Sequence, residues 1–134
     1  HIGARTETVR IRWSVAVMLA EAGRVPGACE RLRTLTGEME HLGMTSEAAI
    51  ASLDVAELLL AQDRYEEVSE ICRAAMLSFE IAGLAYTTRA MTALAYIQEA
   101  TKQRRADRAL VQTVRDYIRR LPAQPNLLFA PPPA

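Results

Sequence analysis

The amino-acid sequence repeats itself with a step of 40 residues. Six residues of the first half return 40 positions later in the same order: Leu19, Arg24, Glu30, Arg33, Glu40 and Gly43 become Leu59, Arg64, Glu70, Arg73, Glu80 and Gly83. A constant period of this size is typical of proteins in which short helical units stack on one another. Such units build a surface, so the period predicts a binding protein and no particular reaction.

Apolar residues spaced by three and four positions predict six helices. The helices are expected over about residues 5–21, 26–42, 46–60, 65–82, 86–100 and 107–121. Gly23, Gly43 and Gly83 follow helical patterns and are suited to end them in a left-handed conformation. The expected fold class is all-α, an α-α superhelix of three antiparallel helix pairs in which the third pair is a charged cap.

Two positions qualify this pattern. Gln103 occupies the turn of the third pair, where the first two pairs have Gly23 and Asp63. Gly37 lies inside the second helix, where glycine weakens a helix by about 1 kcal/mol relative to alanine. We expect Gly37 to let a neighbouring helix approach closely.

The composition changes abruptly after Leu121. Five of the six prolines follow this residue, so we divide the chain into a helical repeat domain, residues 1–121, and an extended Pro-rich tail, residues 122–134. Leu127, Leu128 and Phe129 form an apolar cluster in this tail. We predict that the cluster packs on the helical body or on a neighbouring copy, and simple disorder of the tail is the alternative.

Charge and composition narrow the class of protein. The net charge is zero, but residues 101–134 carry seven Lys or Arg and only two Asp or Glu. This basic region has no DNA-binding motif, so nucleic acid is not expected as a partner. No apolar stretch approaches the roughly 20 residues of a membrane span, and no secretory signal is recognisable. A cytoplasmic location is therefore expected, and the start at His1 suggests a piece of a longer protein.

Residues with catalytic or metal-binding potential are sparse. Cys29 and Cys72 lie within helical patterns and are expected to be buried packing residues. His41 has no nucleophile or orienting carboxylate in its local sequence. The acidic cluster from Glu66 to Glu70 stands at a helix start, where the helix dipole favours carboxylates. We expect no enzymatic activity, no cofactor and no metal.

The repeat residues resemble the tetratricopeptide repeat. The resemblance rests on Trp13, Ala16, Leu19, Gly23-Arg24, Ala28 and Leu32, and on their second copy Leu53, Ala56, Leu59, Asp63-Arg64-Tyr65, Val68 and Cys72. Two features depart from that family: its usual unit is about 34 residues, and Gly43 and Gly83 replace its closing proline. Longer units of this kind resemble the helical sensor segments of bacterial transcription activators and C-terminal parts of multidomain bacterial regulators.

The resemblance implies a concave groove lined by the first helix of each pair. The groove residues would be Arg10, Trp13, Val17, Glu21, Ile50, Leu53, Glu57, Leu60, Leu94 and Ile97. A mostly apolar groove suits an amphipathic or extended hydrophobic segment of a protein partner, with Trp13 as its anchor.

Four alternatives remain beside partner binding. The groove can be filled by a preceding repeat or by residues 127–129 of the tail, and an exposed apolar edge at the first helix would favour a homodimer. A different class of function is a small-molecule-sensing helical domain of a transcriptional or signalling regulator.

Overall fold

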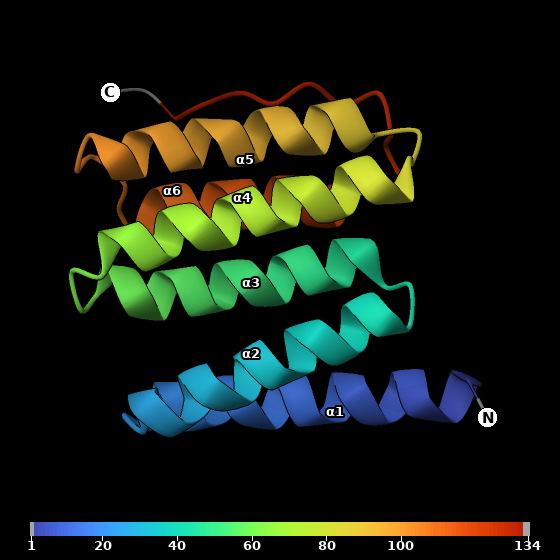
Figure 1. Ribbon diagram of the computed structural model, residues 1–134, viewed down its shortest axis with the longest axis vertical. Coiled ribbons are helices and arrows are strands. Elements are labelled where there is room, and N and C mark those ends of the chain that lie inside the picture. Colours follow the sequence, from blue (N-terminus) through green and yellow to red (C-terminus); the bar gives the residue numbers. More distant parts are fainter. Residues whose placement is uncertain (1, 133–134) are drawn as a thin grey trace.

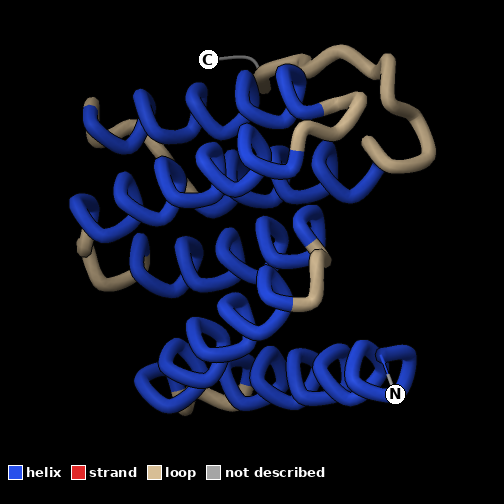
Figure 2. The backbone as a smooth tube through the Cα atoms, turned by 45° about the vertical axis from the view of Figure 1, so that its right-hand side comes forward, coloured by secondary structure: helices blue, strands red, loops and turns tan. Residues whose placement is uncertain are grey.

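The computed structural model describes the backbone of residues 2–132 and the side chains of residues 5–132. Its described part is all-helical, which confirms the all-α fold class (Figures 1 and 2). The six helices are α1 (Ile2–Glu21), α2 (Val25–His41), α3 (Thr45–Leu60), α4 (Tyr65–Ala82), α5 (Thr87–Lys102) and α6 (Arg108–Arg120). None of them is long and apolar enough to cross a membrane. His1, Pro133 and Ala134, at the outer limits of the two predicted segments, lie outside the described residues.

Four of the five turns close in the same way. A backbone N–H just beyond the helix donates to the carbonyl five residues earlier: Arg24 to Leu19, Met44 to Met39, Arg64 to Leu59 and Arg105 to Ala100. This bond needs a left-handed residue one position before the donor. Gly23 and Gly43 supply it in the first two turns, and Asp63 and Arg104 supply it in the other two.

The third pair differs from the expectation at this turn. The left-handed residue is Arg104, with φ of 59°, and not Gln103. Asp63 and Arg104 are 41 positions apart, so the chain holds one more residue here than the 40-residue step predicts. The helix pair keeps its closing bond by shifting it one residue along the chain.

Helices α1 to α5 pack in chain order, each against the next. Helix α6 does not continue this order, because it packs mainly on α3 and less on α5. Figure 1 shows α4 between α3 and α5, with α6 behind α4. The expected third helix pair at the end of the stack is therefore corrected: α6 returns to the middle of the molecule, on the side opposite α4.

This position of α6 explains the core. Leu94 and Ile97 of α5 are fully buried, and Leu53 of α3 is almost so, because these helices are covered on two sides. Helix α6 contributes Val111, Val114 and Ile118, which are all buried. Each fully buried aliphatic side chain of this kind stabilises the fold by about 1.5–3 kcal/mol before conformational entropy is subtracted.

Both cysteines are buried, as predicted, and lie in the helical body. Burial raises the pKa of the Cys72 thiol to about 12. Gly37 does not serve a close approach between helices of this chain. A Cβ at this position would meet no atom within 4 Å.

The tail returns to the helices, as predicted, but through two of its three apolar residues. The hydroxyl of Tyr117 donates to the carbonyl of Leu127 at 2.7 Å. The ring of Phe129 lies 5.5 Å from the ring of Tyr96 and 5.2 Å from that of Tyr117. Leu128 points away and is 73 % exposed, which corrects its expected docking. The described tail contains no helix and passes along the outer side of α5 (Figure 1).

Candidate functional site

Two clefts lie along α3 between α1 and α6, and together we call them the trough. One cleft of about 600 Å³ lies at the start of α3, and another of about 640 Å³ lies at its end. Side chains of the first cleft include Arg10, Trp13, Glu47, Ile50, Tyr86 and Arg119. Side chains of the second include Glu21, Glu57, Leu60, Asp107 and Arg108. Helices α1 and α6 form the walls, and α3 forms the floor.

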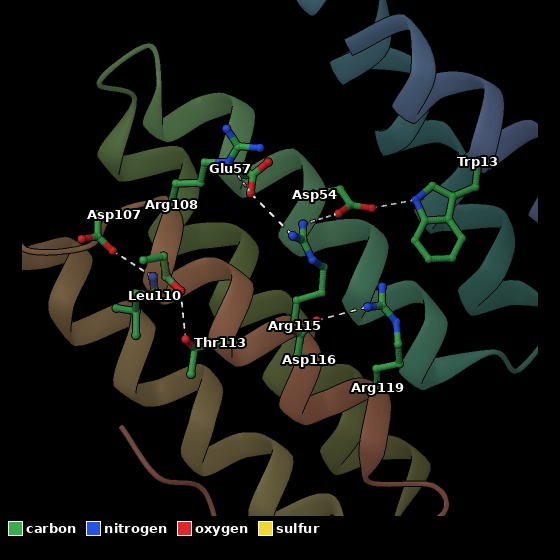
Figure 3. Close-up of polar contacts among 11 residues, drawn as sticks. Trp13, Asp54, Glu57, Asp107, Arg108, Leu110, Thr113, Arg115, Asp116 and Arg119 are labelled. Carbon is green, nitrogen blue, oxygen red and sulfur yellow. Dashed lines mark hydrogen bonds and ion pairs between the residues drawn. The ribbon is translucent and has the colours of Figure 1, made fainter. Parts of the chain in front are cut away.

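A chain of polar contacts crosses the trough between these clefts (Figure 3). The indole Nε1 of Trp13 donates to Oδ2 of Asp54 at 2.7 Å. The other carboxylate oxygen of Asp54 accepts a hydrogen bond from Nη1 of Arg115 at 2.6 Å. One aspartate on α3 therefore holds both α1 and α6.

Asp54 is an ionisable group with limited access to water. Its side chain is 14 % exposed and that of Arg115 is 15 % exposed. Burial raises the pKa of Asp54 above its ordinary value, while the hydrogen bond from Trp13 and the charge of Arg115 act in the opposite direction. Burial has the larger effect, because the carboxylate loses more hydration than its two partners restore.

Glu57 extends this network by one helical turn toward the second cleft. Its Oε1 lies 3.6 Å from Nη2 of Arg115 and 3.6 Å from Nε of Arg108. This oxygen is buried and accepts no hydrogen bond from the described residues. Arg115 thus faces two carboxylates, which fixes the rotation of α6 above α3.

The two ends of the trough differ in charge. At the first cleft, Arg10 forms a two-pronged hydrogen bond with Glu47 at 2.7 and 2.8 Å, and Arg119 adds a second cation. At the second cleft, Glu21, Glu57 and Asp107 outnumber Arg108. Arg119 is itself paired with Asp116 at 3.2 Å, so the two ends differ mainly in that the second cleft is the more acidic.

The structure brings together six of the ten predicted groove residues at these two clefts. Arg10, Trp13 and Ile50 line the first, and Glu21, Glu57 and Leu60 line the second. Val17 is partly buried and packs on the core.

The remaining predicted groove residues do not face the trough. Leu53, Leu94 and Ile97 are buried in the core. This corrects the expected groove, because α6 covers the side of α5 on which Leu94 and Ile97 were expected to meet a partner. On this side of α5 the expected groove is occupied by α6.

Residues of the trough that the sequence did not predict include Asp54, Arg115 and Arg119. Asp54 lies next to Leu53 in the repeat, and nothing local distinguishes it from a surface acid. Arg115 and Arg119 lie on α6, and the apolar spacing of α6 does not indicate that it packs on α3. Among the described side chains, no three His, Cys, Asp or Glu residues gather as they would around a metal ion.

Three acids of the trough, Glu47, Asp54 and Glu57, lie within 4 Å of arginine nitrogens, and Asp107 accepts a hydrogen bond from the backbone N–H of Leu110. No protein-family model matches the chain, and neither a curated protein nor a solved structure matches it.

Proposed function

We propose that the chain is a non-catalytic protein-interaction module whose trough holds an amphipathic segment of a protein partner. In this proposal the helices form a tetratricopeptide-like superhelix within a larger, cytoplasmic bacterial regulatory protein, as the repeat resemblance implies. One observation carries the proposal: two open clefts lie between α1 and α6, one at each end of α3, and charged side chains line both.

The difference in charge between the two ends gives the partner a direction. Arg10 and Arg119 stand at the first cleft, and Glu21 and Asp107 stand at the second. Electrostatic complementarity fixes register and orientation more than it adds affinity. The partner segment is therefore expected to carry acidic residues near the first cleft and basic residues near the second.

Between the charges, Trp13 is the natural anchor. It is half-buried and lines the first cleft, and its ring is held in place by the bond to Asp54. A tryptophan that is already fixed loses little conformational entropy when a partner packs on it. Aromatic residues of this kind often dominate the energy of an interface.

Selection of binding peptides from a displayed library tests this proposal. Selected peptides should bind the wild-type chain and shift the fluorescence of Trp13, its single tryptophan. A double variant, Arg10→Glu with Arg119→Glu, should bind them about tenfold more weakly or worse, because the first cleft becomes acidic. The matched control is Arg73→Glu, since Arg73 is exposed on α4 and outside the trough.

The outcome separates the trough from the rest of the surface. Peptides that bind the double variant as well as the wild type would show that the trough is not their site. Circular dichroism and thermal unfolding of each variant check that the fold is kept. Both arginines are about half exposed, so their replacement leaves the core intact.

Ligand sensing is a second candidate, and the first cleft favours it. Its volume of about 600 Å³ and its aromatic residues Trp13 and Tyr86 suit a small organic molecule. A compound that binds only the folded chain raises the melting temperature. A screen in which no compound does so would remove the support for this candidate.

A further inference from the structure

We propose that α1 and α2 carry a second binding surface, on the side turned away from α3, and that it accepts an amphipathic α-helix of a protein partner. We call this surface the edge groove, and its residues include Ile11, Arg12, Val15, Gly27, Arg31 and Thr34. Figures 1 and 2 show α1 and α2 at one end of the row of helices, with other helices on one side only.

The repeat shows what kind of element belongs in the edge groove. Helices α3 and α4 form a cleft with Ser52, Val55, Ile71 and Ala74 on its walls, and α2 lies over it with Arg33, Thr36 and Glu40. The residues 40 positions before those four are Arg12, Val15, Arg31 and Thr34. All four line the edge groove. The edge groove is therefore the same site, one repeat earlier, without its covering helix.

The volumes of the edge groove and of the cleft between α3 and α4 differ as expected if only the second has a covering helix. The cleft between α3 and α4 retains about 150 Å³, because α2 fills the rest. The edge groove has about 500 Å³, and it adjoins a further cleft of about 650 Å³ that shares Arg12 and Thr34 with it. Together the two clefts extend along the pair of helices, as a docked helix requires.

The exposure of apolar side chains shows the same difference. Ile11 and Val15 are 59 % and 39 % exposed, whereas Ala51 and Val55, 40 positions later, are 0 % and 1 % exposed. Met18 is also more than half exposed. Ile11, Val15 and Met18 are spaced by four and three, so they form one apolar stripe on α1. A stripe of this kind, rimmed by polar residues, marks an interaction site.

Two glycines lower the α2 wall of the groove. Gly27 and Gly37 have no left-handed backbone that would require glycine, and a Cβ at either would meet no atom within 4 Å. In α4 the equivalent positions are Glu67 and Leu77. Glycine weakens a helix relative to alanine, and here it leaves room for the backbone of another helix.

The charges of the groove indicate the chemistry of the occupant. Arg5, Arg12 and Arg31 line the two clefts, against Glu30 and Glu38, and Arg12 is paired with Glu38 at 2.8 Å. An occupant with an apolar stripe and acidic flanks complements these walls. Helix α2 has this character, since it carries three glutamates and two arginines, and it already occupies the equivalent groove.

The probe is therefore a fluorescent peptide with the sequence of residues 25–44, carrying Cys29→Ser, titrated with the full chain. The peptide should bind the wild type, and Val15→Glu should weaken binding about tenfold or more, because a carboxylate would be buried against apolar atoms. The matched control is Ile81→Glu, at an exposed apolar residue of α4 outside the groove, which should bind as the wild type does. Equal binding by Val15→Glu and the wild type would overturn the proposal.

A joined helix covers the case in which the free peptide is not helical. A second copy of residues 25–44 is placed directly before Arg5, so that it precedes α1 as α2 precedes α3. The joined helix should raise the melting temperature and slow the oxidation of Met18 by peroxide, and Val15→Glu should abolish both effects. No change in either quantity would overturn the proposal.

Light scattering separates a foreign helix from a second copy of the chain. If the wild type is a dimer that Val15→Glu dissociates, and the joined helix has no effect, the occupant is a second copy and the proposal fails. The outcome is independent of the trough, because none of these changes lies in its two clefts.

Discussion

Trp13 and Asp54 lie 41 positions apart in the sequence, and the indole of the first donates to the carboxylate of the second at 2.7 Å. The bond joins the first helices of two successive repeats, which otherwise touch over few residues. Because Asp54 also accepts from Arg115, the same carboxylate joins α1, α3 and α6.

Replacing Asp54 should loosen this junction. Asp54→Ala leaves the indole N–H and the guanidinium of Arg115 without their acceptor, so we expect the free energy of unfolding to fall by about 2 kcal/mol. Asp54→Asn keeps an acceptor for Trp13 and should cost about half as much. Urea unfolding followed by the fluorescence of the single tryptophan measures both changes.

The control for this prediction is the ion pair between Asp116 and Arg119 on the surface of α6. Both side chains are more than half exposed, so Asp116→Asn should change stability little. A loss from Asp116→Asn as large as that from Asp54→Ala would show that burial of the Asp54 network is not what matters.

Stability should depend on pH in opposite directions at two carboxylates. Burial raises the pKa of Asp54 in the folded state. The stabilisation that follows from this shift is greatest below the pKa of Asp54 in the unfolded chain, and it is lost as the pH rises through the pKa in the folded chain. The hydrogen bonds from Arg64 and Arg33 lower the pKa of Glu67 in the folded state. The stabilisation that follows from this shift is present above the pKa of Glu67 in the unfolded chain, and it is lost as the pH falls through the pKa in the folded chain.

Single variants isolate these two effects. Between about pH 7 and about pH 3, the stability of the wild type relative to Asp54→Asn should increase as the pH falls. Its stability relative to Glu67→Gln should decrease over the same range. Parallel slopes for the two comparisons would contradict the assigned shifts.

The tail should stabilise the helices through Phe129 and not through Leu128. Phe129→Ala removes ring contacts with Tyr96 and Tyr117, and we expect a loss of about 1–2 kcal/mol in thermal or urea unfolding. Leu128→Ala should have almost no effect, since Leu128 is exposed. A chain shortened after Leu121 that keeps its stability and oligomeric state would refute the role of the tail.

The thiol of Cys72 should react only when the structure opens. It is fully buried, and its pKa of about 12 leaves almost no thiolate at neutral pH. In a Cys29→Ser variant, reaction with a disulfide reagent should be slow in buffer and should accelerate with urea in step with unfolding. Rapid reaction in buffer would contradict the burial of Cys72.

The helices of the first two pairs could be predicted because their signals are local. Apolar spacing and the glycines at positions 23, 43 and 83 act within a few residues of each helix. The left-handed residue of the third turn could not be predicted, because one additional residue in the chain moves it from Gln103 to Arg104. An arginine gives no sign of a left-handed conformation.

The position of α6 could not be predicted for a different reason. Its pattern shows which face is apolar, but Val111, Val114 and Ile118 would be buried equally well against α4 or against α3. The contact that distinguishes these arrangements is between Arg115 and Asp54, which are 61 positions apart. Pairing at this distance leaves no trace in the periodicity of either helix.

The placement of Phe129 makes the two ends of the row of helices unequal. The tail lies on the outer side of α5, where a helix following α5 would otherwise pack, while Ile11 and Val15 of α1 face outward without such a cover. One end of the row is therefore covered by the chain's own tail, whereas the other end presents apolar side chains to its surroundings.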